Sequence, residues 1–145
     1  MDCGVGGITS TFDYIIGNKG VDTEEAYPYK VTEGKCKFNA SAVGATMKGH
    51  VGINSGYENA LLDAVVSGPV SVAFESIYLL QDYEKGIFYD PSCKKPANLT
   101  HAMTIVAYCI VRNSWRQSRR EQGYGRILRG KNLCRIADFA SYPVV

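Results

Sequence analysis

Near the start of the chain, four apolar residues recur with the period of a helix that buries one face: Ile8, Phe12, Ile15 and Ile16. This pattern predicts a helix over about residues 9–18, and Gly20 provides a stop signal. Residues 24–36 keep no sustained period, which is typical of an ordered loop. Residues 42–53 are expected to hold one strand.

A capping box predicts where a second helix begins. Ser55 and Glu58 have the three-residue spacing at which each side chain satisfies the other's free backbone N–H. Apolar residues then follow in helical register, so we expect a helix over about residues 56–66. The pair Gly68-Pro69 ends it.

The remainder of the chain predicts mainly short strands. Residues 70–74 are apolar and rich in β-formers, and residues 101–108 are apolar on both faces, as in a central strand. Three further strands are expected, at residues 86–89, 110–115 and 123–128, with a turn or short helix near 77–83 and a loop at 90–96. Two helices ahead of four or more strands predict one α+β domain over 1–145, built on an antiparallel sheet or half-barrel.

The composition is that of an ordinary globular protein. The 145 residues are 46% hydrophobic and 21% charged, which excludes a disordered, collagen-like or coiled-coil chain. No stretch approaches the roughly 18 apolar residues that cross a bilayer. The first residues also lack the pattern of a signal peptide. We therefore expect no membrane partner, and the chain shows no export signal.

The charge is unevenly distributed along the chain. Residues 112–135 hold eight basic residues and one acidic residue, although the net charge of the whole chain is only +2. Such a segment can contact nucleic acid or an anionic surface, or it can be a solvated face. Because it lacks interleaved aromatic residues and any nucleic-acid-binding motif, we expect no nucleic-acid partner.

Five cysteines leave disulfides and free thiols as alternatives: Cys3, Cys36, Cys93, Cys109 and Cys134. They form no CxxC pair and have no histidine at zinc-finger spacing, so no structural metal site is expected. Glycosylation sequons at Asn39 and Asn98 favour a secretory environment. The odd number of cysteines means that at least one has no partner within the chain.

Only two histidines are present. His50 has no pattern of partners near it and is interpreted as a surface residue. His101 begins the apolar strand directly after a loop, and the tripeptide Asn-Ser-Trp follows from Asn113. A histidine at such a position is either a structural residue or a catalytic base.

Short motifs follow one another along the chain in this order: Phe12-Asp13-Tyr14-Ile15, Lys19-Gly20-Val21-Asp22, Glu25-Ala26-Tyr27-Pro28-Tyr29, Gly68-Pro69-Val70-Ser71-Val72-Ala73, Lys85-Gly86-Ile87-Phe88-Tyr89, Leu99-Thr100-His101-Ala102, Asn113-Ser114-Trp115, Gly123-Tyr124, Ile136-Ala137 and Ala140-Ser141-Tyr142-Pro143. In this order they resemble the papain and cathepsin family of cysteine proteases, cathepsin L and K type, over essentially the whole chain. The resemblance implies a papain-like α+β fold, here a barrel-like antiparallel β lobe with parts of the helical lobe.

The resemblance also implies hydrolysis of peptide bonds in a peptide or protein substrate by a cysteine thiolate, with no cofactor or metal. His101 matches the base, Asn113 the residue that orients its ring, and Trp115 the indole that shields this contact from water. Six residues match walls of the substrate pocket: Gly6, Ile8, Ala73, Leu99, Ala102 and Phe139. By the same resemblance the protein is expected in the lysosome or outside the cell.

The nucleophile of the family lies in a Cys-Gly-Ser-Cys-Trp type of motif, which these residues do not contain. The family spacing places it about 30 residues before Met1, and the glutamine of the oxyanion hole is also absent. Cys109 cannot replace it, because eight extended residues separate it from His101 by about 26 Å. By resemblance, Cys93 pairs with Cys134.

The resemblance and the strand pattern lead to further expectations. The partners of Cys3 and Cys36 would lie in the earlier segment, and Cys109 replaces a glycine. The chain is expected to be incomplete and inactive by itself, and a separate chain that supplies the N-terminal lobe is a candidate partner. A non-catalytic module that binds peptides or proteins is the alternative. Without a turn after residue 101, the strand would also carry Asn113 away from His101, which argues against their contact.

Overall fold

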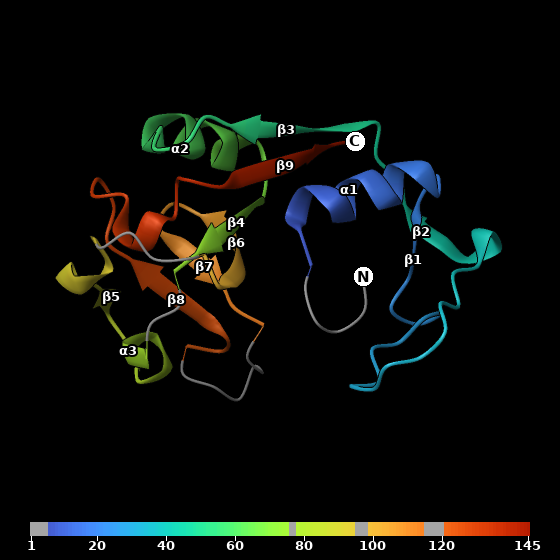
Figure 1. The fold of residues 1–145 in the computed structure, drawn as a ribbon, viewed down its shortest axis with the longest axis horizontal. Coiled ribbons are helices and arrows are strands. Elements are labelled where there is room, and N and C mark those ends of the chain that lie inside the picture. The colour runs from blue at the N-terminus through green and yellow to red at the C-terminus, as the bar shows by residue number, and fades with distance from the viewer. Residues whose placement is uncertain (1–5, 76–77, 95–98, 115–120) are drawn as a thin grey trace. The chain divides into compact units, whose positions relative to one another are not determined.

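The computed structural model describes residues 6–75, 78–94, 99–114 and 121–145 (Figure 1). Its helices are α1 (Ile8–Gly17), α2 (Glu58–Ser67) and α3 (Tyr78–Gln81), with short 3-10 helices at Ala40–Ala42, Pro91–Lys94 and Leu133–Arg135. Its strands are β1 (Val21–Asp22), β2 (Val43–Ala45), β3 (Gly49–Ile53), β4 (Val70–Phe74), β5 (Ile87–Phe88), β6 (His101–Ala107), β7 (Ile110–Arg112), β8 (Tyr124–Ile127) and β9 (Ala140–Val144). In the described ranges, no helix has the length and apolar character needed to cross a membrane.

The chain forms two compact units, which are described separately. The first comprises residues 1–51 and 143–145, and the second comprises residues 52–142. In the first unit, α1 confirms the predicted helix, although none of its residues is fully buried. Residues 42–53 hold two strands rather than the single one expected, because residues 46–48 separate β2 from β3. β1 pairs antiparallel with β2.

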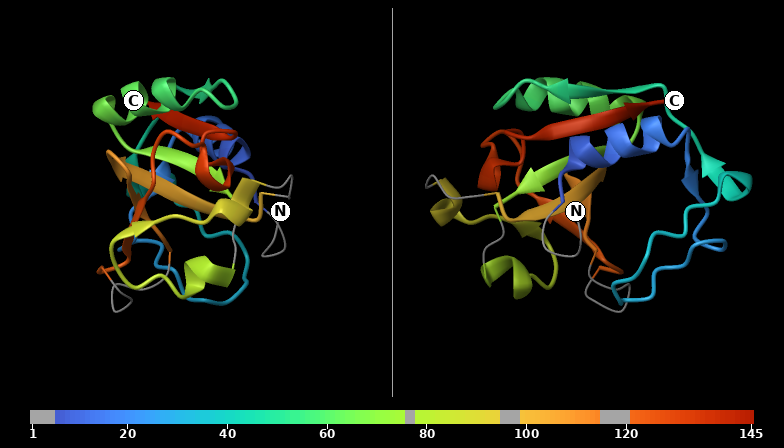
Figure 2. Two further views of the ribbon diagram at one scale, coloured as in Figure 1. Left: turned by 90° about the vertical axis from the view of Figure 1, so that its left-hand side faces the viewer. Right: turned by 45° about the vertical axis from the view of Figure 1, so that its right-hand side comes forward.

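Seven strands form the larger sheet, in the order β3-β9-β4-β6-β7-β8-β5, and Figures 1 and 2 show its central strands side by side. The pairs of β4 with β6 and β9, and of β7 with β6 and β8, are antiparallel, as expected. β5 differs, because it runs parallel to β8. β9 had no counterpart among the predicted strands.

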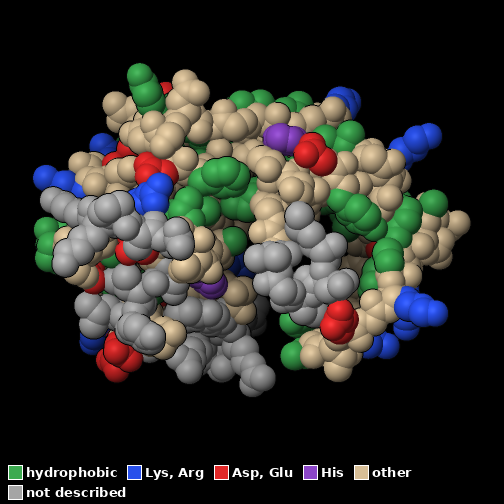
Figure 3. Space-filling model, viewed as in Figure 1, with side chains coloured by type: hydrophobic (Ala, Val, Ile, Leu, Met, Phe, Trp, Pro, Cys, Tyr) green, Lys and Arg blue, Asp and Glu red, His purple; other side chains and the backbone are tan. Residues whose placement is uncertain are grey.

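The core of the second unit lies on one face of this sheet. Alternate residues of β4 are fully buried there, and Leu61 and Val65 of α2 are buried with them. In β6 the predicted central position is confirmed, because β4 and β7 flank it. The expected burial of both faces is wrong: Met103 and Ile105 are buried, whereas the alternate residues stay partly exposed. Apolar side chains also reach the surface, as the green atoms in Figure 3 show.

The predicted second helix is present as α2, but the predicted capping box is not. Tyr57 is the N-cap residue, with no side-chain hydrogen bond. The Glu58 carboxylate instead accepts hydrogen bonds from the backbone N–H groups of Gly130 (2.7 Å) and Asn132 (3.0 Å). This carboxylate therefore ties the start of α2 to a loop more than 70 residues later.

Candidate active site

A hairpin brings Asn113 back beside His101, contrary to the straight strand expected from the sequence. β6 ends at Ala107, a two-residue turn follows, and β7 runs antiparallel to β6 with Thr104 opposite Arg112. Cys109 in this turn adopts the left-handed conformation, with φ of 63°. Glycine adopts this conformation most readily, but here the chain turns at a cysteine.

His101 and Asn113 share one face of this hairpin. The register of β6 with β7 places them as diagonal neighbours, a separation that long polar side chains can bridge. The half-buried His101 ring contacts the Asn113 amide, with 2.9 Å between Nε2 and Oδ1. The backbone N–H of Ser114 also donates to Oδ1, at 2.7 Å, and the Asn113 N–H donates to the Gly123 carbonyl. Both the amide and its backbone are therefore held in place.

This contact determines the protonation pattern of the ring. An amide oxygen only accepts hydrogen bonds, so the Nε2 that faces it carries the proton. In the neutral ring the lone pair then belongs to Nδ1. The geometry thus makes Nδ1 the basic nitrogen of the neutral His101 ring.

Three of the residues matched to the substrate pocket lie next to one another. Ala73 of β4 is directly opposite Ala102 of β6. The Ala73 N–H donates to the Phe139 carbonyl at 2.8 Å. The Phe139 side chain is 42% exposed. Leu99 is half-buried and precedes Thr100, whose N–H donates to the Phe74 carbonyl at 3.2 Å.

The geometry of the second unit does not test three other predicted residues. Gly6 and Ile8 belong to the first unit, where Gly6 is exposed and Ile8 begins α1. Trp115 lies outside the described residues. Its role, like the pocket roles of the other two, stays a prediction from the resemblance.

The predicted disulfide between Cys93 and Cys134 is confirmed, with 4.5 Å between the two Cα atoms. Cys109 and Cys36 are free thiols, whereas Cys3 lies outside the described residues. Cys109 follows the far end of β6, so it does not face His101. The exposed Cys36 has its pKa lowered by the backbone N–H of Phe38 and by the Tyr14 hydroxyl, 3.6 Å from Sγ. Among the described residues, no cluster of His, Cys, Asp and Glu could hold a metal ion.

A network around Asn132, which the sequence did not predict, fixes the segment that ends at Phe139. The Asn132 backbone is left-handed, with φ of 43°. Its side chain accepts from the Ala137 N–H at 2.8 Å and donates to Asp138 at 2.7 Å. Arg135 forms an ion pair with Asp138 at 2.7 Å. Asparagine tolerates the left-handed region well, which is the one local signal for this turn.

Comparison with known proteins shows to which family this chain is similar. A model of the papain family cysteine proteases matches residues 1–144. The chain belongs to this family. Digestive cysteine proteinase 2 of Homarus americanus is 42% identical over 99% of the chain and 47% of its own length. Cathepsin S of Bos taurus is 38% identical over 99% of the chain and 46% of its length.

Solved structures agree with the papain-like fold. The digestive procathepsin L2 of Tenebrio molitor larval midgut superposes with a TM-score of 0.90 at 35% identity, over 97% of this chain and 47% of that one. Procathepsin L 3 of the same organism superposes with a TM-score of 0.91 at 38% identity, over 99% of this chain and 50% of that one. The papain-like chain thus spans about half the length of the relatives it matches.

Proposed function

We propose that residues 1–145 are the C-terminal part of a papain-like peptidase domain and provide the base of a cysteine endopeptidase. The hydrogen bond between His101 Nε2 and Asn113 Oδ1 carries this proposal, because it leaves Nδ1 as the proton acceptor. The thiolate would come from a segment outside these residues. Membership of the papain family and cysteine-protease relatives support this interpretation.

In the proposed reaction, Nδ1 of His101 takes the proton of the cysteine thiol, and the thiolate attacks the carbonyl carbon of the scissile peptide bond. The resulting imidazolium returns a proton to the leaving amine, so the C–N bond breaks and an acyl-enzyme remains. A water molecule, deprotonated by the same imidazole, then releases the acyl group and restores the thiol. Asn113 holds the ring in one orientation through these transfers.

The side of the site that binds substrate would be the row of Ala73, Ala102 and Phe139. Ala73 and Ala102 are small and lie opposite each other, and by the family resemblance the partly exposed Phe139 ring would close the far end of the substrate pocket. We infer a preference for a modest apolar side chain next to the scissile residue. The half-buried apolar face of α1 supports packing against a further segment of the protein. The lysosome or the extracellular space is the proposed location.

A fusion protein tests this function. The N-terminal part of the Homarus proteinase that precedes the matched region is joined to residues 1–145, and hydrolysis of a fluorogenic dipeptide amide is measured. We expect turnover by the fusion and none by residues 1–145 alone. His101→Ala should lower kcat by about 10²–10⁴-fold, and Asn113→Ala should cause a smaller loss. His50→Ala, which changes the other histidine, is the matched control and should leave kcat unchanged.

Two results would contradict the proposal. A folded fusion that reacts with an electrophilic thiol label but keeps its turnover after His101→Ala would remove the base from this position. Turnover by residues 1–145 alone, abolished by His101→Ala, would show that the nucleophile lies within them.

A non-catalytic module that binds peptides is the second candidate. The observation in its favour is that Ala73, Ala102 and Phe139 are adjacent without any contribution from a thiol. Binding of a labelled, uncleavable dipeptide amide by residues 1–145 alone, lost on Phe139→Ala, together with a fusion that shows no turnover, would favour it.

A further inference from the structure

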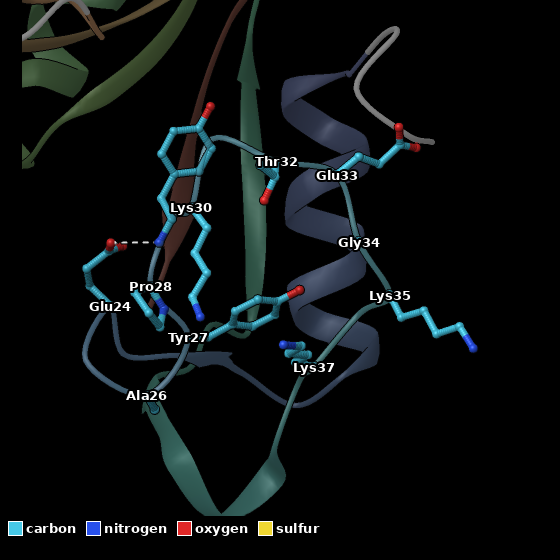
Figure 4. Close-up of a pocket in the computed structure, with 11 residues that line it drawn as sticks. Glu24, Ala26, Tyr27, Pro28, Lys30, Thr32, Glu33, Gly34, Lys35 and Lys37 are labelled. Atoms are coloured by element: carbon cyan, nitrogen blue, oxygen red, sulfur yellow. Dashed lines mark hydrogen bonds between the residues drawn. The ribbon is translucent and has the colours of Figure 1, made fainter.

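The first unit contains an open pocket formed entirely by the loop after β1. Its volume is about 650 Å³. The loop residues that line it are Glu24, Ala26, Tyr27, Pro28, Tyr29, Lys30, Thr32, Glu33, Gly34, Lys35 and Lys37, shown in Figure 4. Neither the hairpin with His101 nor the proposed reaction uses any of them. An inference about this pocket therefore stands apart from the proposed function.

Hydrogen bonds close the loop and give the pocket a defined wall. The Glu24 carboxylate accepts from the Tyr29 N–H at 2.9 Å, the dashed contact in Figure 4. The Ala26 N–H donates to the Thr23 hydroxyl at 3.2 Å. At the other end of the loop, Asp22 accepts from the Asn39 N–H at 2.9 Å. Both ends of the loop are thus fixed by side chains.

The lining residues are nearly balanced in charge, but the lysine and glutamate side chains are not evenly distributed around the pocket. In the view of Figure 4, the ammonium groups of Lys30 and Lys37 lie on either side of the Tyr27 ring. Glu33 points away from this space, and the Glu24 carboxylate is engaged by a backbone N–H. Neither lysine forms an ion pair with any residue in the described part of the chain. The pocket therefore carries a small excess of positive charge, with two lysines outside any of these ion pairs beside an aromatic ring.

Val31, between Lys30 and Thr32, has a strained backbone. Its φ is 57°, a conformation that β-branched residues rarely adopt. Its side chain is 78% exposed, so burial of the valine does not explain the strain. Strained residues of this kind cluster at ligand-binding loops, where the backbone is held in one orientation. Here the strain occurs at the residue next to Lys30.

We propose that this pocket binds an acidic peptide segment, with its carboxylates beside Lys30 and Lys37 and its chain over Tyr27. Tyr27, Tyr29 and the small apolar residues of the wall offer contact surface to a peptide. The pocket has no arginine, the side chain that suits two-pronged recognition of phosphate. Lysine ammonium groups act as single point charges and accept carboxylates in many orientations.

The test measures fluorescence anisotropy of labelled tetraglutamate titrated with residues 1–145. The titration is run at about 20 mM salt and again at about 200 mM salt, because salt screens the attraction between opposite charges at an exposed site. Tetraglutamine is the neutral probe. Lys30→Gln with Lys37→Gln removes the two charges of the pocket. Lys85→Gln with Lys131→Gln is the matched control, since it removes two exposed charges elsewhere.

We expect the Lys30 and Lys37 double variant to bind tetraglutamate about tenfold more weakly, with the control double variant unchanged and tetraglutamine unbound. Amide NMR shifts on titration should concentrate in residues 24–37, which checks the site even if a variant unfolds. Equal losses in both double variants would overturn the proposal in favour of unspecific charge attraction. No binding of tetraglutamate, or binding of a heparin tetrasaccharide alone through the same lysines, would also overturn it.

Discussion

Replacing Glu58 tests whether its contact with the distant loop, rather than a capping box, stabilises the second unit. Glu58→Ala removes the acceptor for the N–H groups of Gly130 and Asn132. A hydrogen bond to a charged group contributes about 1.5–3 kcal/mol. Gly130 is exposed, so water can replace its bond, whereas Asn132 is only partly exposed. We therefore expect a loss of about 2–3 kcal/mol, most of it from Asn132.

The assay is urea and thermal denaturation of residues 1–145, followed by circular dichroism. For a chain of this size, each kcal/mol corresponds to roughly 2–4 °C, so Tm should fall by about 5–10 °C. Glu58→Gln keeps an oxygen acceptor and should lose less. Asp63→Ala, an exposed acidic residue on the same helix, is the matched control and should change stability by less than about 0.5 kcal/mol. A Glu58→Ala variant as stable as this control would refute the reasoning.

Three further outcomes are expected in the same assay. Cys109→Gly should stabilise the protein by about 0.5–1 kcal/mol, because relief of the left-handed strain exceeds the added flexibility of the unfolded chain, whereas Cys109→Ala should give no gain. Replacing Cys93 and Cys134 by serine should cost about 4 kcal/mol, since the bridge closes a loop of 41 residues; a reductant-independent midpoint would contradict this. Burial raises the pKa of Asp138, but hydrogen bonds from Arg135 and neighbouring groups outweigh it and hold the pKa below its usual value. Its contribution to stability should therefore be present above about pH 4 and fade as pH falls through the lowered pKa, so Asp138→Asn should flatten the acid side of the stability profile; an unchanged slope would contradict the assignment.

Local sequence patterns were sufficient to predict the helices and strands that bury one regular face. The helical spacing near residue 8 and the apolar residues 70–74 correspond to α1 and β4 in the structure. The period of side chains along a helix or strand depends only on backbone geometry, so neighbours in the sequence reveal it. The motifs also singled out His101 and Asn113, which the structure brings into contact, and the resemblance anticipated the disulfide.

Such local patterns could not predict contacts between segments that are distant in the sequence. The apolar run after His101 continues through Cys109, so the sequence suggested a straight strand where the structure has a hairpin. Glu58 fits a capping box by spacing, but a free N–H of the loop near Asn132 competes for the same carboxylate. β9 contains Pro143, which weakens a strand signal, and it becomes a strand because β4 offers it a partner.

The sequence by itself determined which residue types are available for chemistry here: one imidazole in a family motif, an amide twelve residues later, and the two cysteines that pair. Only the tertiary structure decided that the imidazole and the amide meet, because their contact depends on the left-handed turn at Cys109 and on the register of β6 with β7. The positive pocket likewise depends on where Lys30 and Lys37 point, which the nearly balanced charge of the loop sequence conceals. Composition fixes the charges of a segment, whereas the folded backbone fixes which of them face the same space.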